Sequence, residues 1–287
     1  MGSPCAFKLY HSNKETLDGA ITLAHQEVLR LEKKYSRFLP SSELSHINSQ
    51  AGFAPVLVDE ETAGLINYAA MCFELSDGLF DITSGTLRRV WDFKSNKLPS
   101  QEQIDNILPF VGFNKIHWDG HNITLPKSME IDLGGVVKEY AADCACQVLM
   151  DQGIECGLVD LGGDISVVGC RPSNQPWMAG IRDPNHPQVP AITIALTDGA
   201  IATSGYYERY MMVDGQRYCH ILNPKTGWPV QFCATVAIKS PRCLVSGSLA
   251  TIAMLKQQQA NSWLAEQGAN FFMEDSQGQR FGNLTDA

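Results

Sequence analysis

Clusters of basic residues and long apolar runs are both missing from this sequence of 287 residues. Its 22 Lys and Arg are outnumbered by 31 Asp and Glu, which gives a formal net charge of −9. Because nucleic acids and anionic membranes attract positive charge, we expect neither as a partner. No run approaches the roughly 20 apolar residues that cross a bilayer, so we expect no membrane span in this chain. The first residues also lack the basic start and apolar stretch of a signal peptide.

Most of the short motifs that identify a common class of enzyme are absent as well. The sequence has no Cys-x-x-Cys pair, no Gly-x-Gly-x-x-Gly or Walker A loop, and no His-Glu-x-x-His, Gly-x-Ser-x-Gly or EF-hand pattern. These absences set aside the commonest zinc, dinucleotide-fold, P-loop, metalloprotease, hydrolase and calcium sites.

The nine cysteines are odd in number, and most lie in apolar stretches such as Cys144–Cys146. They show the spacing of neither a disulfide framework nor a zinc site, so we interpret them as buried, reduced thiols. Reduced thiols favour a reducing compartment, and we therefore expect a cytoplasmic protein. The alternative is an exported protein whose signal has been removed.

The composition and the hydrophobic patterns predict an α+β fold. Hydrophobic residues make up 44% of the chain and charged residues 18%, values typical of globular proteins. Apolar spacing and turn residues predict helices at 14–35, 59–76, 101–112, 138–153 and 249–259. They predict strands at 3–10, 157–161, 165–168, 177–181, 191–196 and 234–238, with a closing hairpin from 271. Because helices and strands do not alternate regularly, we expect a single domain over 1–287, with lobes and mixed or antiparallel sheets packed with helices.

Two pairs of glycines indicate places where a ligand can approach the backbone. Gly134 and Gly135 connect a strand end to a helix, whose free N–H groups and the nearby Lys138 suit a phosphate group. A second pair lies between Asp160 and Asp164. Each pair alone is equally compatible with an ordinary tight turn, but two pairs at strand ends favour a ligand cleft.

Two further stretches combine polar side chains with turns. Residues 201–209 and 220–229 bring hydroxyl groups, glycines and His220 within a short span, which suits an oxyanion or phosphate site. The simpler alternative is that His220 only braces its turn. In residues 77–83, Phe80 and Asp81 follow an Asp-Gly turn and are candidates to contact a ring-shaped ligand. This stretch is also compatible with a loop that ends the preceding helix and contacts no ligand.

Taken in order, these stretches resemble the ApbE family, the FAD:protein FMN transferases. The resemblance runs nearly end to end and rests on ordered motifs at compatible spacing. The matching segments are Met1–Ser3, Tyr35–Phe38 with Ser42–Leu44 and Asn48, Asp77–Asp81 with Trp91, Asp132–Lys138, Gly162–Asp164, Thr203–Gly205, and His220–Ile221 with Pro224–Gly227.

The resemblance implies a transferase with a flavin cleft. Such an enzyme binds FAD with Mg²⁺ and moves the FMN moiety onto a Thr or Ser of an acceptor flavoprotein, releasing AMP. By family position, the FAD site would be lined by Met1, Phe38, Leu79, Phe80, Asp81, Asp132, Lys138 and Ile221. The metal would lie near the carbonyl of Gly135 and the hydroxyl of Thr251, and His220 is our candidate for the catalytic base. The family also includes exported lipoproteins.

The sequence departs from the family pattern at the expected metal site. The family usually places an Asp four residues before the Thr of its C-terminal helix, whereas Gly247 occupies that position here, and Asn223 stands where Asp is usual. Since Mg²⁺ prefers carboxylate oxygen, we expect weakened metal binding that Gly247→Asp would strengthen. Two alternatives follow for the function: a non-catalytic FAD-binding protein, or a Mg²⁺-dependent FAD pyrophosphatase in which water replaces the acceptor hydroxyl.

Overall fold

A seven-stranded sheet forms the centre of the structure, a computed structural model that describes residues 4–95, 97–184, 186, 188–207 and 209–287. All neighbouring strands in this sheet pair antiparallel. In spatial order the strands are β1 (Cys5–Tyr10), β5 (Cys156–Leu161), β6 (Asp164–Gly169), β9 (Ala200–Gly205), β12 (Cys233–Ser240), β13 (Asn270–Asp275) and β14 (Arg280–Gly282). The α+β class with antiparallel sheets is therefore confirmed.

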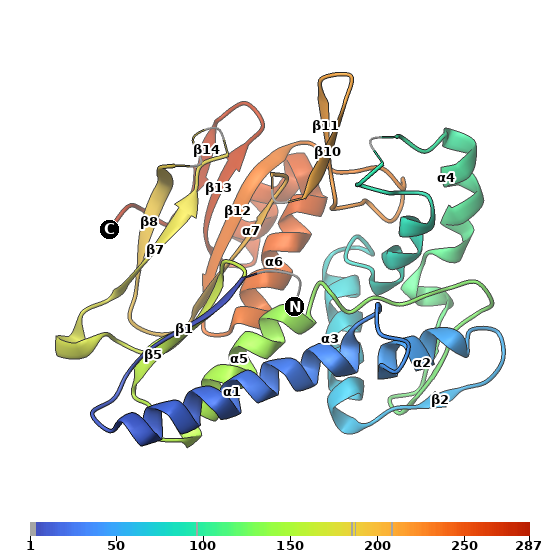
Figure 1. Cartoon of the computed structure of the whole chain (residues 1–287). Helices are drawn as coiled ribbons and strands as arrows, with labels where there is room; N and C mark the ends of the chain where they lie inside the picture. The colour runs from blue at the N-terminus through green and yellow to red at the C-terminus, as the bar shows by residue number, and fades with distance from the viewer. Residues whose placement is uncertain (1–3, 96, 185, 187, 208) are drawn as a thin grey trace.

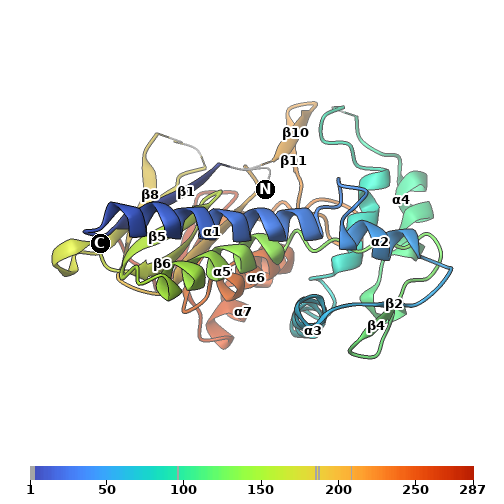
Figure 2. The ribbon, with the colours of Figure 1, turned by 60° about the horizontal axis from the view of Figure 1, so that its bottom comes forward.

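Both faces of the sheet are covered, as the alternation of buried side chains along its strands requires. On β5, for example, Leu158 and Val159 point to opposite faces and belong to two different hydrophobic clusters. One face packs against the helices α1 (Lys14–Tyr35), α5 (Val137–Asp151), α6 (Cys243–Lys256) and α7 (Ala260–Glu266). Of these, α1 and α5 run side by side in Figure 2. The other face packs against the hairpin of β7 (Trp177–Arg182) and β8 (Pro190–Leu196).

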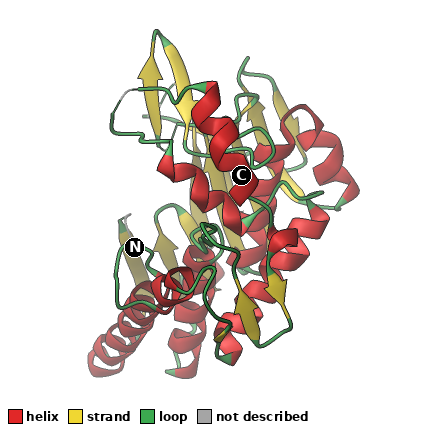
Figure 3. Cartoon of the chain, turned by 90° about the vertical axis from the view of Figure 1, so that its right-hand side faces the viewer, coloured by secondary structure: helices red, strands yellow, loops and turns green. Residues whose placement is uncertain are grey.

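The remaining elements form a largely helical region beside the sheet, at the right of Figure 1. It contains α2 (Glu43–Ser49), α3 (Glu60–Leu75), α4 (Gln101–Ile107), the 3₁₀ helix η1 (Ile82–Arg89) and a small sheet of β2 (Val56–Leu57), β4 (Asn122–Thr124) and β3 (His117–Trp118). The hairpin of β10 (Tyr210–Val213) and β11 (Gln216–Cys219) stands up from the top of the molecule in Figure 3. Shorter 3₁₀ turns are η2 (Leu108–Phe110), η3 (Phe113–Lys115), η4 (Pro172–Asn174) and η5 (Gln257–Gln259).

Helices that have a regular apolar stripe or a capping residue in their own sequence lie where the sequence predicts them. The helix predicted at 14–35 is α1, and Asp59 caps α3 by accepting a hydrogen bond from the Thr62 N–H, as its position suggests. The helix predicted at 101–112 gives way to a 3₁₀ turn after Ile107, because Pro109 lacks the N–H that an α-helix needs. The last predicted helix, at 249–259, starts too late, since α6 begins at Cys243.

One cluster of buried apolar side chains extends from Ala20 on α1 to Met273 on β13. The division of the chain into domains nevertheless stays a prediction, for which a single cooperative unfolding transition is the test. None of the described helices has the length and apolar character needed to cross a bilayer.

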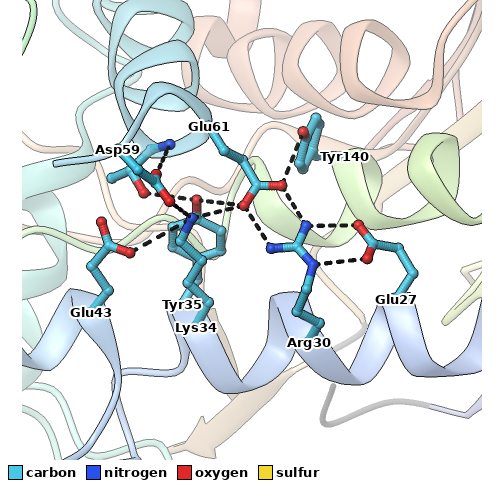
Figure 4. Close-up of polar contacts among 9 residues, drawn as sticks. Glu27, Arg30, Lys34, Tyr35, Glu43, Asp59, Glu61 and Tyr140 are labelled. Atoms are coloured by element: carbon cyan, nitrogen blue, oxygen red, sulfur yellow. Dashed lines mark hydrogen bonds and ion pairs between the residues drawn. The ribbon is translucent and has the colours of Figure 1, made fainter.

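A cluster of charges ties α1 to the helical region and to α5 (Figure 4). The Glu61 carboxylate on α3 accepts hydrogen bonds from Arg30 at 2.6 and 2.9 Å and from Lys34 at 2.8 Å, and the Tyr140 hydroxyl lies 3.3 Å away. Lys34 also donates to Asp59 at 2.5 Å. Because Glu61 is only 20% exposed, these contacts are partly shielded from water.

This cluster predicts a loss of stability in acid. Hydrogen bonds from Arg30, then Lys34, lower the pKa of Glu61 from 4.5 to about 2. A carboxylate with a depressed folded-state pKa stabilises the protein above its unfolded pKa, and the contribution disappears as the pH falls from about 4.5 towards about 2. We expect Glu61→Gln to lower the free energy of unfolding by about 1–3 kcal/mol near neutral pH. Urea unfolding at several pH values checks this prediction. Between pH 4.5 and about 2, the free energy of unfolding should fall less for Glu61→Gln than for the wild-type protein. An equal decrease in both proteins would contradict the prediction.

Candidate functional site

Helices α5 and α6 face each other antiparallel on one face of the sheet, where α5 packs against β5 and β6 and α6 packs against β9 and β12. Near the end of this contact, Asp143 on α5 accepts hydrogen bonds from the N–H groups of Cys243 and Leu244 at 2.9 and 3.0 Å. One turn earlier on α5, Glu139 contacts Gly247, which lies one turn later on α6. Thr251 lies one further turn along α6 from Gly247, and Gly135 lies in the turn that precedes α5. A contact of both residues with one metal ion stays a prediction.

Glu139 occupies the space that a side chain at position 247 would need. A Cβ added to Gly247 would lie 2.9 Å from the Cδ and 3.0 Å from the Oε1 of Glu139, closer than packed side chains normally approach. Glu139 is only 6% exposed, and its Oε2 is buried without a hydrogen-bond partner. Such an atom is costly in a folded protein and indicates a missing partner.

Lys138 and Asp164 form an ion pair beside Glu139. The Lys138 ammonium contacts the Asp164 carboxylate and lies 3.5 Å from the Oε1 of Glu139. Burial disfavours the charge on Lys138, but the two carboxylates outweigh this effect and raise its pKa. Burial raises the pKa of Glu139, as does Asp164, against the opposing effect of Lys138. The other oxygen of Asp164 accepts the Thr203 N–H of β9 at 3.0 Å, which fixes the carboxylate.

His220 follows β11 directly, at a bend in the chain. Its Nδ1 lies 3.1 Å from the carbonyl oxygen of Arg209, which can only accept, so Nδ1 carries the proton and Nε2 is left with a free lone pair in the neutral ring. The ring is accessible, but surrounding protein atoms, followed by the charges of Arg209 and Lys138, lower its pKa below 6.5. The geometry therefore leaves His220 neutral and able to accept a proton at neutral pH.

The turn after His220 shares a pocket of about 490 Å³ with Asp81. Gly78, Pro224 and Lys225 also line this pocket. The structure thus brings together two stretches that the sequence analysis identified separately. The volume lies within the range of small-molecule sites.

Asp81 uses its carboxylate to hold the pocket wall. One oxygen accepts the N–H and hydroxyl of Thr83 at 2.8 and 2.6 Å, and the other accepts the Phe113 N–H at 3.0 Å. The ring of Phe80 lies 3.4 Å from the position of a Cβ on Gly135, which connects this wall to the start of α5. A direct contact between Asp81 and FAD stays a prediction.

Asp132 lies among arginines rather than in a free carboxylate position. Arg88 donates to it, and Arg37 lies 3.8 Å from it. The Arg37 guanidinium also lies 4.4 Å from the centre of the Phe38 ring, which is 78% exposed. Phe38 is therefore an accessible aromatic surface beside positive charge.

The other expected FAD contacts are less informative. Leu79 and Ile221 are partly buried and pack against the main core. Met1 lies outside the described residues.

A magnesium ion fits the oxygen atoms present at the α5–α6 contact. Among the described residues, no group of three or more His, Cys, Asp or Glu side chains forms a metal cluster. Mg²⁺, however, is commonly held by one or two carboxylates together with substrate phosphates and other oxygens. Here the Oε2 of Glu139 has no partner, the Asp164 carboxylate is held by Lys138 and the Thr203 N–H, and the Thr251 hydroxyl lies 3.3 Å from that of Ser204.

The sequence analysis missed Glu139, although the sequence carries a signal for it. Helical periodicity places Glu139 on the same side of α5 as Ala142 and Cys146, both buried. An acidic residue on an apolar helix face needs a partner or a function. The partner position, Gly247, lies 108 positions further along the chain, so no local pattern connects the two.

Comparisons with known proteins agree with the fold and identify the family. The model of the ApbE family matches residues 1–273. A Treponema pallidum protein named FAD:protein FMN transferase is 30% identical over 276 residues, covering 88% of this chain and 75% of that protein. The crystal structure of the ApbE protein from Thermotoga maritima is similar with a TM-score of 0.88 at 30% identity, covering 96% of this chain and 93% of that one. The apo flavinyl transferase ApbE from Pseudomonas stutzeri gives 0.85 at 25% identity, covering 100% and 92%.

Proposed function

The chain belongs to the ApbE family, and on that premise we propose that it is an FAD:protein FMN transferase that moves the FMN moiety of FAD onto a Thr or Ser of an acceptor flavoprotein. The observation that carries this proposal is the position of Lys138 in the first turn of α5, where its ammonium group contacts Asp164. A second support is His220, whose Nδ1 is held by the Arg209 carbonyl and whose pKa is lowered. A cation at a helix N-terminus suits a pyrophosphate, and a neutral imidazole suits a hydroxyl that must lose a proton.

The transfer exchanges one P–O bond for another. The acceptor hydroxyl oxygen forms a bond to the FMN phosphorus, while the bond from that phosphorus to the bridging pyrophosphate oxygen breaks. AMP leaves with the bridging oxygen, and the hydroxyl proton passes to the Nε2 of His220. Lys138 neutralises negative charge on the phosphate oxygens once FAD displaces its contact with Asp164.

Magnesium supplies additional positive charge to the phosphate oxygens when it is bound. The residues that would hold it include Gly135 through its carbonyl and Thr251 through its hydroxyl. Phe38 offers an exposed ring for stacking against an aromatic part of FAD. Binding energy from that contact would orient the pyrophosphate at Lys138.

AMP release separates this proposal from its two alternatives. The protein is incubated with FAD and Mg²⁺, with and without an acceptor flavoprotein produced in its flavin-free form. We expect AMP release that requires the acceptor. Equal AMP release without the acceptor would indicate a pyrophosphatase, and intact FAD under both conditions would indicate a non-catalytic FAD-binding protein.

We further propose a reducing compartment, the cytoplasm, as the place where the protein works. Support comes from five buried free thiols, those of Cys72, Cys146, Cys219, Cys233 and Cys243. Burial raises the pKa of Cys146 and Cys233 to about 12, which makes these thiols unreactive. Thiol titration of the denatured, unreduced native protein should find all nine cysteines of the chain reduced. Several missing thiols would favour an exported form, such as a lipoprotein.

A further inference from the structure

We infer that Glu139 on α5 supplies the metal-binding carboxylate that Gly247 on α6 lacks. The inference deepens the proposed function and rests on it, because it concerns the cation that assists pyrophosphate cleavage. It assigns to this chain a ligand that comes from the facing helix.

The first support is the contact between the two positions. An aspartate at 247 would extend its carboxylate one bond beyond its Cβ. The Oε1 of Glu139 lies 3.0 Å from where that Cβ would be, so the Glu139 carboxylate fills the same region. Glycine at 247 is what allows this, since any larger residue would displace Glu139.

The second support is that Glu139 has an oxygen to offer. Its Oε2 is one of two buried side-chain nitrogen or oxygen atoms, within the described part of the chain, that have no hydrogen-bond partner. Asp143, one turn away, is fully occupied by Ser166 and by the two N–H groups at the start of α6. The orphaned atom therefore belongs to the one carboxylate that contacts Gly247.

The third support is the charge and chemistry around Glu139. Lys138 neutralises one of the two neighbouring carboxylates, through its ion pair with Asp164. When Glu139 loses its proton, one further negative charge arises at a buried place, and a hard divalent cation that also meets substrate phosphate would compensate it. Thr251 follows Gly247 by one turn of α6, and Gly135 lies two residues before the start of α5.

A structural role is the competing explanation. Glu139 would then remain a neutral acid bonded to Asp164 and never meet a metal. Glu139→Gln separates the two roles, because glutamine keeps the shape and the hydrogen-bonding capacity but is a much poorer ligand for a hard cation.

The test is a Mn²⁺ titration followed by electron paramagnetic resonance, with Mg²⁺ competition, on the intact protein without FAD. Mn²⁺ binds oxygen sites much as Mg²⁺ does and is directly observable. We expect Glu139→Gln to weaken Mn²⁺ binding by about 10-fold or more. Two results would overturn the inference. One is that Glu139→Gln binds Mn²⁺ as tightly as the wild-type protein does. The other is that Mg²⁺ displaces no bound Mn²⁺ from the wild-type protein.

A double variant moves the carboxylate back to α6. Glu139→Gly alone should lose the metal, and Glu139→Gly with Gly247→Asp should regain most of the wild-type affinity. Gly247→Asp alone should lower the melting temperature, because the new side chain collides with Glu139; the strengthening that the sequence suggests for this variant requires Glu139 to be removed first. No recovery in a double variant with a wild-type melting temperature would count against the inference. If the double variant does not fold, Glu139→Gln decides.

FAD binding and AMP release, measured separately, keep this result distinct from the proposed function. Loss of the metal in Glu139→Gln with FAD binding retained supports the inference whatever the acceptor proves to be. A wild-type protein that transfers FMN while Glu139→Gln binds Mn²⁺ normally would overturn the inference and leave the proposed function intact.

Discussion

Replacing His220 by alanine should lower the turnover of FMN transfer by about 10²–10⁴-fold, the usual contribution of a general base. The reason is the fixed tautomer of this ring: the bond from Nδ1 to the Arg209 carbonyl leaves Nε2 as the proton acceptor. FAD affinity should change much less than turnover, because the proton moves only in the transition state. Single-turnover AMP release and FAD titration measure the two quantities.

His220→Asn is the matched control for a bracing role. The asparagine amide can still donate to the Arg209 carbonyl but cannot take up a proton. If His220 only braces its turn, His220→Asn should retain wild-type turnover. In that case His220→Ala should have both a lower melting temperature and a lower affinity for FAD. Normal AMP release in His220→Ala would remove the catalytic role.

The pH dependence of turnover follows from the lowered pKa of His220. Since the neutral ring is the active form, turnover should rise with pH and level off once the imidazole has lost its proton. Because burial and the nearby cations depress this pKa, the midpoint of the acidic limb should lie below 6.5. A midpoint above 6.5 would indicate another group.

Asp143→Ala should lower the free energy of unfolding more than Glu61→Gln or Ser166→Ala does. The Asp143 carboxylate is buried and accepts bonds from the Ser166 hydroxyl at 3.0 Å and from the Cys243 and Leu244 N–H groups at 2.9 and 3.0 Å. It therefore caps α6, whose own preceding residue, Arg242, provides no side-chain cap. Losing a helix cap and leaving a buried hydroxyl unpaired should together lower the free energy of unfolding by about 2–4 kcal/mol.

Ser166→Ala is the control for this prediction, because it removes one of the three bonds and leaves the helix cap in place. It should lower the free energy of unfolding by about 1 kcal/mol. Urea unfolding of both variants measures the difference. An Asp143→Ala protein as stable as Ser166→Ala would show that α6 does not depend on a cap from α5.

The elements that the sequence predicts well are those specified locally. Helix α1 has a regular apolar stripe and an N-cap at Asn13, which accepts hydrogen bonds from the N–H groups of Glu15 and Thr16. Helix α6 begins six residues before its predicted start, because its cap comes from Asp143, 100 positions earlier in the chain. Local reasoning cannot find a cap that only tertiary packing provides.

The same limit applies to the site. Residues 201–209 carry polar side chains and glycine, and the sequence indicates no strand there, yet residues 200–205 form β9 at the centre of the sheet. The Thr203 N–H reaches Asp164 only because β9 and β6 are neighbours. The motifs thus identify the segments that meet, while the pairing of Glu139 with Gly247 depends on the register of two helices.

The most direct test of the transferase assignment is the mass of an acceptor flavoprotein after incubation with this protein, FAD and Mg²⁺. Intact-protein and peptide mass spectrometry should show an increase by FMN less one water, on a single Thr or Ser, with one AMP released for each acceptor modified. An acceptor of unchanged mass in the presence of bound FAD and a functional acceptor site would contradict the account.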